Sequence, residues 1–223
     1  MTTTTDLSPD AYAAMRSAMV SSQLRTTAVN DPRVVAAMAR VPRERFLPGD
    51  MRAFAYRDGT LPLGRGRYLN LPMATGRLLT EAYLTPADRV LLIGAATGYT
   101  AAVLAELVAH VTAVESDAIL LAIARDALGN HPKVELVQGD LETGAPDRGL
   151  HDVMIIDGAI EFVPDTLLGQ VRTDGRVTTG LVDGGVIRLA TGRRTSGGFG
   201  LATFADVECV VLPGFSRPRR FTF

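Results

Sequence analysis

The middle of the chain alternates short apolar runs with helix-forming stretches, and this alternation constrains the fold more than any other feature. Apolar runs predict strands at 89–93, 111–115, 133–137 and 152–156. Helices are expected at 99–108, 117–128 and 164–170. Runs such as "VLLI" and "VMII" lack polar alternation, which is typical of strands covered on both faces. Strands that alternate with helices predict an α/β fold with a mostly parallel sheet and right-handed crossovers.

The sequence on either side of this core has a different pattern. Ser8-Pro9 and Asp31-Pro32 can each start a helix, so residues 1–50 are expected to form a helical N-terminal layer. Residues 51–84 contain "GTLPLGRGRYLNLP", which is broken by glycines and prolines and is interpreted as a structured loop before a helix. Residues 85–223 supply the sheet, and the glycine-separated strands near the end predict antiparallel pairing at one edge. With no linker between these parts, 1–223 is predicted to be a single domain.

Bulk properties exclude several classes of protein. The formal net charge is −1, so neither nucleic acid nor an anionic membrane is an expected partner. Cys209 is the only cysteine, which excludes an intramolecular disulfide and suits a reducing cytoplasm. The start "MTTTTDLSPD" has no basic or apolar segment of a signal peptide, and a cytoplasmic location is expected. Three scattered histidines and one cysteine have no metal-ligand spacing, so no metal is expected.

The stretch "VLLIGAATGYTAAVL" has the outline of a cofactor loop between a strand and a helix. Gly94 lies just past the strand and allows a sharp turn, while Gly98 permits close approach of the backbone to a ligand. Ala95 and Ala96 add only methyl groups, so the loop can remain tight. Tyr99 begins the helix and can wall the cleft.

Acids stand at the ends of the next three predicted strands, where open parallel sheets bind ligands. Glu115 follows Gly94 by about 20 residues, the spacing at which an acid binds ribose hydroxyls. Asp140 could accept a hydrogen bond from an adenine amino group, and Asp157 ends the fourth strand. A plainer interpretation is that strands often end in Gly or Asp because turns need them. Without a phosphate-binding lysine, acidic strand ends favour a ligand with hydroxyls, an amine and a sulfonium, which describes S-adenosylmethionine.

Several motifs together resemble the protein-L-isoaspartate O-methyltransferase family. They are, in order, "QLRTTAVNDPRVVAAMARVPRERFLP", "AYRDGTLPLGRG", "VLLIGAATGYTAAVLAEL", "VTAVES", "VELVQGD", "HDVMIIDGAIEFVPDTLLGQVRTDGRV" and "LPGFSRPRRFTF". The resemblance covers about residues 16–190 and extends toward the C-terminus. The N-terminal block and the "LPLG" stretch are specific to this family, whereas the rest would fit many class I methyltransferases.

The resemblance implies a Rossmann-like class I methyltransferase. Its fold is a seven-stranded, mostly parallel sheet with helices on both faces and an antiparallel C-terminal hairpin. It implies S-adenosyl-L-methionine as cofactor, with the Gly94–Tyr99 loop around the methionine moiety. The expected contacts beyond that loop lie at the next three strand ends: Glu115 and Ser116 at the ribose, Asp140 and Leu141 at the adenine, and Asp157 and Gly158 near cofactor and acceptor.

The chain departs from the family pattern as a diverged member would. Leu92 stands where the family usually has an acid, and Ala96 stands where it usually has glycine. The acceptor loop of the family typically reads G-H-G-Q-T-I-S-Q-P, whereas this chain has "GRGRYLNLP". Asn70 could donate a hydrogen bond to an acceptor carboxyl group, and Arg65 or Arg67 could hold the carboxylate through two parallel N–H bonds. The arginines could equally belong to a solvated loop face, and Tyr68 to a packed lid.

The predicted activity is methylation of a carboxylate of L-isoaspartyl residues in damaged proteins. The expected partner is a protein or peptide with such residues, and the chain is expected to be a monomer or dimer. Two alternatives stay open. One is a methyltransferase with a different, small-molecule acceptor, because Tyr68 and Leu71 make the loop more apolar. The other is a non-catalytic cofactor-binding protein.

Overall fold

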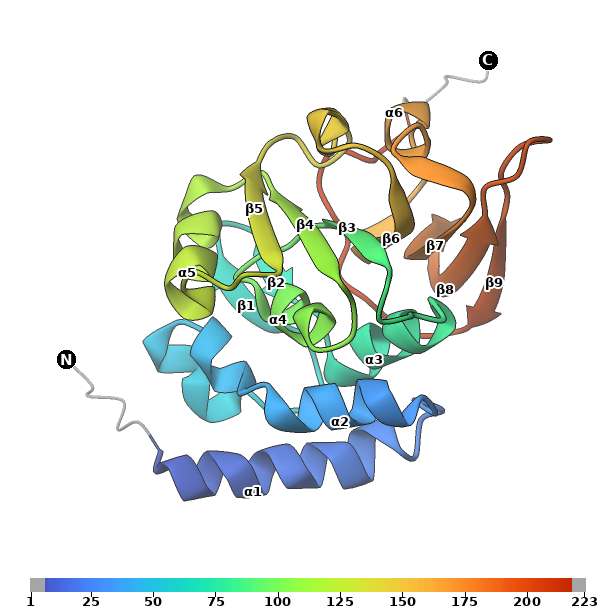
Figure 1. Cartoon of the computed structure of the whole chain (residues 1–223). Helices are drawn as coiled ribbons and strands as arrows, with labels where there is room; N and C mark the ends of the chain where they lie inside the picture. The colour runs from blue at the N-terminus through green and yellow to red at the C-terminus, as the bar shows by residue number, and fades with distance from the viewer. Residues whose placement is uncertain (1–6, 218–223) are drawn as a thin grey trace, which may run out of the picture.

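The computed structural model describes residues 7–217, in which a mixed sheet stands above a layer of helices (Figure 1). The threonine-rich start and the last residues of the C-terminal motif lie outside the described part. The sheet has the order β5-β4-β3-β6-β7-β8-β9. Its strands are β3 (Arg89–Ile93), β4 (His110–Glu115), β5 (Val134–Gln138), β6 (His151–Ile160), β7 (Val171–Asp183), β8 (Val186–Arg193) and β9 (Leu201–Ala205).

Pairing within the sheet confirms the predicted fold class. The strands from β5 to β7 are parallel, whereas β8 pairs antiparallel with both β7 and β9. The predicted fourth strand continues past 156 to Ile160, which carries β6 beyond Asp157. Because β3, β4, β5 and β6 are parallel, their carboxyl ends all lie on the same side of the sheet, which is where such sheets bind ligands.

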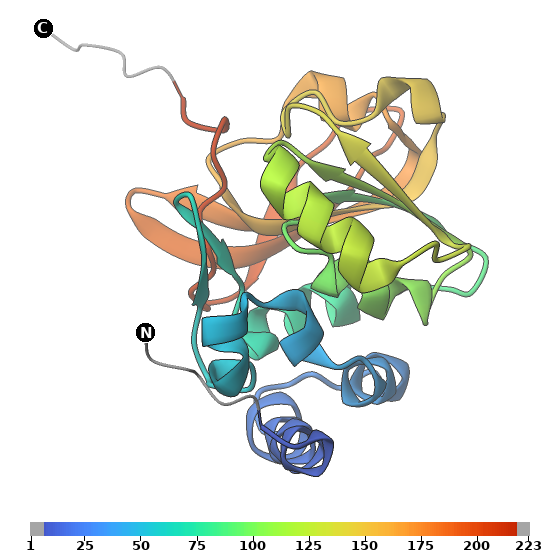
Figure 2. The same ribbon diagram turned by 90° about the vertical axis from the view of Figure 1, so that its left-hand side faces the viewer.

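Alternate residues of β3 pack into separate cores, as expected for a strand covered on both faces. Val90 and Leu92 join the core under the N-terminal layer, while Leu91 and Ile93 join the core on the opposite face. The first face is covered by the longer helices, as Figure 2 also shows. These are α1 (Pro9–Met19), α2 (Pro32–Arg40), α3 (Pro72–Glu81), α4 (Tyr99–Ala105) and α5 (Ala118–Leu128).

Short elements and the C-terminal segment cover the opposite face. They comprise the single turn η4 (Pro146–Arg148), the short helix α6 (Asp165–Leu168) and the chain around Leu212 and Phe215. Leu212 lies so close to the main chain that a Cβ added at Gly94 would stand 2.9 Å from it, and one at Gly158 2.6 Å. The C-terminal segment therefore packs against the turn after β3 and against β6.

The N-terminal layer follows from capped helices. Ser8 and Asp31 accept hydrogen bonds from the first turns of α1 and α2, each of which begins with proline. A π-helical turn η1 (Val20–Leu24) extends α1, and two 3₁₀ helices follow α2, η2 (Arg43–Phe46) and η3 (Gly49–Phe54). The helical layer predicted for residues 1–50 is present over its described part.

The stretch "GTLPLGRGRYLNLP", interpreted from its glycines and prolines as a structured loop without a regular element, does contain strands. It forms an antiparallel hairpin of β1 (Leu61–Gly64) and β2 (Arg67–Leu69), which is a sheet of its own. The tip supplies the turn, because Gly64, Arg65 and Gly66 all have positive φ. Leu61 and Leu69 are buried and anchor the base of the hairpin.

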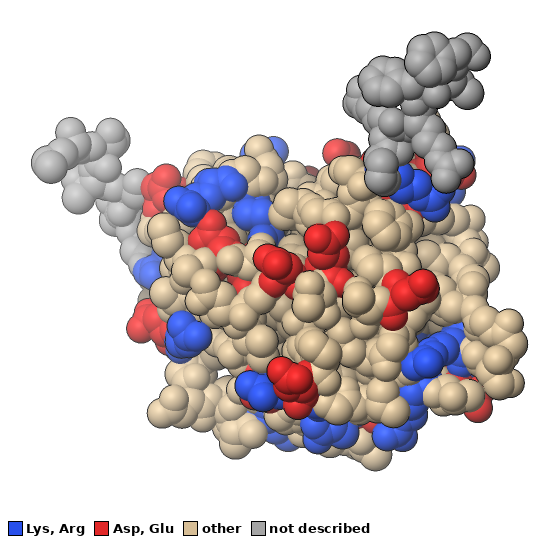
Figure 3. All heavy atoms as spheres, turned by 90° about the horizontal axis from the view of Figure 1, so that it is seen from above, with Lys and Arg blue, Asp and Glu red and all other residues tan. Residues whose placement is uncertain are grey.

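The surface of the described residues mixes charges of both signs. On the face in Figure 3, acidic side chains lie around the middle and basic ones nearer the margin, with no broad field of one sign among the residues described there. No helix within residues 7–217 is long and apolar enough to cross a membrane.

Candidate active site at the carboxyl ends of the strands

The loop after β3 is a tight turn tied to the neighbouring strand. The amides of Gly94 and Ala95 both donate to the carbonyl of Val114, at 3.1 and 2.9 Å. Gly94, Ala96 and Gly98 have φ values of +80°, +49° and +94°. Ala96 is the exception, because an alanine in the left-handed region carries strain that glycine avoids. The sharp turn predicted at Gly94 is present.

Gly98 and Tyr99 pack against protein instead of lining an open cleft. A Cβ on Gly98 would stand 3.0 Å from Leu128 of α5, so this glycine allows close helix packing. The Tyr99 ring is fully buried, contacts Phe46 edge-on at a centroid distance of 5.8 Å, and lies 4.7 Å from the Arg43 guanidinium carbon. Burial raises the pKa of the Tyr99 hydroxyl. Tyr99 joins the loop after β3 to the N-terminal layer.

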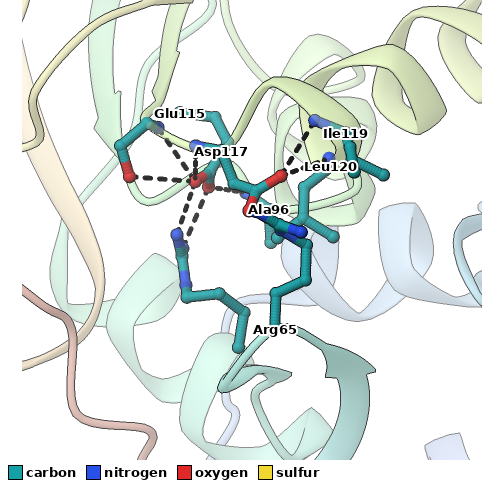
Figure 4. A network of polar contacts seen from close by, with 8 residues as sticks. Arg65, Ala96, Glu115, Asp117, Ile119 and Leu120 are labelled. Atoms are coloured by element: carbon teal, nitrogen blue, oxygen red, sulfur yellow. Dashed lines mark hydrogen bonds and ion pairs between the residues drawn. The ribbon is translucent and has the colours of Figure 1, made fainter.

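Glu115 is the centre of the polar network in Figure 4. Its side chain is fully buried, and it accepts backbone N–H bonds from Ala96 at 2.7 Å, Ser116 at 2.9 Å and Asp117 at 3.0 Å. The loop after β3 and the end of β4 therefore both hold this carboxylate in place.

The two arginines of the hairpin reach the same strand end. Arg67 forms a two-pronged pair with Glu115, with Nη1–Oε1 at 2.5 Å and Nη2–Oε2 at 2.9 Å. Arg65 pairs with Asp117, which also caps α5 through the amides of Ile119 and Leu120 (Figure 4). The hydrogen bond from Arg65 is the largest cause that lowers the pKa of Asp117. Both arginines thus lie on the side expected for the cofactor, paired with acids.

Asp157 forms a second buried cluster. Its carboxylate accepts from Asn70 Nδ2 at 2.9 Å, Thr75 Oγ1 at 3.2 Å and Thr100 Oγ1 at 2.5 Å. These donors come from the exit of the hairpin, from α3 and from α4. Asp157 therefore ties three elements to β6.

Asn70 uses both ends of its amide inside the protein. While Nδ2 donates to Asp157, Oδ1 accepts from the amide of Val210 at 2.8 Å, and the Asn70 carbonyl accepts from Arg43. Arg43 is fully buried and also donates to the carbonyl of Ala55 at 2.8 Å. Burial lowers the pKa of Arg43, against the opposing effect of Tyr99 and Asp157.

The remaining predicted residues lie nearby. Asp140 is exposed at the turn after β5, and its carbonyl accepts from Thr143 and Gly144, while Leu141 beside it is buried. Sequence reasoning missed Arg43, Thr75, Thr100 and Leu212. For two of them the available signals were the first arginine of "VPRERF", directly after a proline, and a hydroxyl one position after Tyr99.

Comparisons with known proteins agree with this architecture. The family model described as Protein-L-isoaspartate(D-aspartate) O-methyltransferase matches residues 14–199. A protein-L-isoaspartate O-methyltransferase of Synechococcus sp. is 40% identical over 74% of this chain and 69% of its own length. One of Herpetosiphon aurantiacus is 34% identical over 92% of each chain.

A solved structure shows the same fold. A Plasmodium falciparum protein, assigned as a protein-L-isoaspartate O-methyltransferase and solved in complex with S-adenosyl-L-homocysteine, superposes with a TM-score of 0.76. It is 16% identical, and the match covers 88% of this chain and 97% of that one. With a family model that matches most of its length and relatives at this identity, the chain belongs to the protein-L-isoaspartate O-methyltransferase family.

Proposed function

We propose that the chain is an S-adenosylmethionine-dependent O-methyltransferase that methylates the carboxylate of L-isoaspartyl residues in proteins. The observation that carries this proposal is the buried Glu115 carboxylate, cradled by the amides of Ala96, Ser116 and Asp117 at the carboxyl end of β4. Family membership supplies the reaction, and Glu115 supplies the place in this chain where the cofactor binds.

The residues fit such a cofactor by their chemistry. Glu115 would hold the ribose hydroxyls, Asp140 and Leu141 would flank the adenine, and the Gly94–Tyr99 loop would surround the methionine moiety. When bound, the cofactor supplies a methyl group made electrophilic by its sulfonium. The acids at the strand ends suit that positive charge and those hydroxyls.

Methyl transfer to a carboxylate needs alignment more than proton transfer. An isoaspartyl carboxyl group is ionised at pH 7, so the chain need not supply a general base. Positioning can contribute up to roughly 7–11 kcal/mol in favourable intramolecular systems. Asp157 and Asn70 contribute to this alignment. Their hydrogen bonds are made within the protein, and they fix the exit of the hairpin against α3, α4 and the C-terminal segment.

Transfer of tritium from labelled cofactor tests the proposal. An isoaspartyl peptide should be labelled, and the same peptide with an ordinary aspartyl residue should not. Labelling of a metabolite extract instead of the peptide would favour a small-molecule acceptor. No labelling at all, with cofactor still bound, would favour a non-catalytic cofactor-binding protein.

Calorimetry with S-adenosyl-L-homocysteine tests the cofactor site separately. Hydrogen bonds to a charged group contribute about 1.5–3 kcal/mol each, so Glu115→Gln should weaken binding tenfold or more. A matched control is Glu135→Gln, which removes an acid on the neighbouring strand β5 that pairs with Arg148 at the surface. Equal affinity for wild type and Glu115→Gln would remove Glu115 from the site.

We also infer a cytoplasmic protein that is a monomer or dimer. The support for the compartment is compositional, since Cys209 is the sole cysteine and is buried. Cell fractionation and light scattering after size-exclusion chromatography measure these two properties.

A further inference from the structure

The Glu115 carboxylate has no acceptor capacity left in this structure. Its Oε1 accepts from Arg67 Nη1 and the amides of Ser116 and Asp117, and its Oε2 accepts from Arg67 Nη2 and the amide of Ala96. Oε1 also accepts from the Ser116 hydroxyl at 3.4 Å, so a carboxylate with about four acceptor sites meets six donors here. Ribose hydroxyls can therefore bind Glu115 only where donors have left.

Arg67 is the donor that can leave. The three amides belong to the loop after β3 and to the start of α5, which are fixed by the sheet and the helix. Arg67 comes from the hairpin, which has no strand pairing with the main sheet. Its two N–H groups lie where a pair of hydroxyls would have to be, because both point at the two oxygens of one carboxylate.

The Arg67–Glu115 pair is not an ordinary surface ion pair. Arg67 is 7% exposed and Glu115 is 0% exposed, so solvent screens their attraction little. Arg65, two residues away, adds a second contact between the hairpin tip and the start of α5. Arg67 is the first residue of β2, directly after a tip of three successive residues with positive φ, so it lies at the end of the hairpin farthest from the buried Leu61 and Leu69.

We propose that Arg67 is an internal competitor for the ribose-binding carboxylate, and that it must leave Glu115 before the cofactor binds. This inference rests on the proposed function. Only molecules in which Arg67 has left Glu115 can bind the cofactor, so the apparent affinity equals the intrinsic affinity multiplied by the fraction of such molecules. If that fraction is about one in a hundred, affinity is reduced about a hundredfold. The hairpin thereby sets the cofactor concentration at which the enzyme becomes loaded.

Calorimetry with S-adenosyl-L-homocysteine on Arg67→Gln tests the proposal. Affinity should rise tenfold or more, because the glutamine cannot neutralise or bridge the carboxylate. The matched control is Arg40→Gln, which removes an exposed pair with Glu106 of 2.9 Å and should leave affinity unchanged. Arg67→Lys offers a milder change, since a lysine cannot bridge both oxygens, and it should give an intermediate gain.

A fluorescent reporter gives an independent measurement of hairpin movement. The chain has no tryptophan, and Tyr68 at the hairpin is 47% exposed, so Tyr68→Trp introduces a single emitter beside Arg67. Addition of S-adenosyl-L-homocysteine should shift its emission in the Arg67 protein. When Arg67→Gln is combined with Tyr68→Trp, the emission before S-adenosyl-L-homocysteine is added should already differ from that of Tyr68→Trp alone. The shift on addition should then be smaller.

The outcomes separate this inference from the function beneath it. One outcome is that Arg67→Gln and Arg67→Lys bind S-adenosyl-L-homocysteine no more tightly than wild type while still unfolding cooperatively. That result overturns the claim that Arg67 competes for Glu115, but it leaves the proposed cofactor site intact. The absence of binding by wild type and by every variant overturns the proposed function and the competitor together. If Arg67→Gln fails to fold, the comparison of wild type with Arg67→Lys decides by the same criterion.

Discussion

Replacement of Asn70 by alanine should destabilise the protein without touching its hydrophobic core. The Asn70 side chain is 1% exposed and makes two hydrogen bonds, to Asp157 at 2.9 Å and from the Val210 amide at 2.8 Å. The bond to a charged carboxylate contributes about 1.5–3 kcal/mol and the bond from a neutral amide about 0.5–1.5 kcal/mol. The expected loss is therefore about 2–4 kcal/mol.

Thermal unfolding measures this loss directly. In a chain of this size 1 kcal/mol corresponds to about 2–4 °C, so the midpoint should fall by roughly 5–15 °C. Asn70→Ser, which keeps one donor, should lose less. Arg40→Gln should change the free energy of unfolding by no more than about 1 kcal/mol, because its ion pair is exposed.

One result would refute the reasoning. If Asn70→Ala melts within about 2 °C of wild type, its two contacts are replaced by water, and Asn70 does not hold the C-terminal segment in place. In that case a loss of activity in the same variant would point instead to contact between Asn70 and the acceptor.

Two further predictions concern the loop after β3 and the core below β6. Ala96→Gly should leave the affinity for S-adenosyl-L-homocysteine equal or better. It should change the free energy of unfolding by less than about 1 kcal/mol, because relief of the positive-φ strain offsets the added unfolded-state entropy. A collapse of affinity in calorimetry would show that the Ala96 methyl group is a needed contact. Burial lowers the pKa of His151, which bonds Thr112 and the Gln170 carbonyl at 3.2 Å. Native His151 resists protonation, so its contribution to the free energy of unfolding should be complete above about pH 6.5 and decline below it. In urea unfolding, the difference in that free energy between wild type and His151→Gln should be smaller at pH 5.5 than at pH 7.5. An equal difference at the two pH values would contradict this.

The sheet could be predicted because its determinants are local. An apolar run such as "VLLI" specifies a strand covered on both faces wherever it occurs, and the regular spacing of such runs specifies the crossovers. The hairpin was missed because the same glycines that break an element also make its turn. The flanking residues are seen to be strands from their pairing in the structure, which joins Leu61 with Leu69 and Pro62 with Tyr68.

The site was predictable in part for the same reason. Glu115 follows from its distance along the chain to Gly94, whereas its partner Arg67 lies 48 residues earlier in another sheet. Asn70 was noticed as a change of residue type, but its bond to Val210 joins residues 140 apart. No local pattern reports such contacts, and they decide which polar groups are free for a ligand.

The bond between Asn70 and Val210 also has a consequence for synthesis on the ribosome. Chains emerge from the N-terminus, and β3, β4, β5 and β6 are all available before the segment around Val210 leaves the exit tunnel. Until then the Asn70 amide lacks one partner, and Leu212 does not cover Gly94 and Gly158. An unfinished chain can thus assemble these four strands early, whereas the contacts of Asn70, Gly94 and Gly158 with the C-terminal segment form only after that segment has emerged.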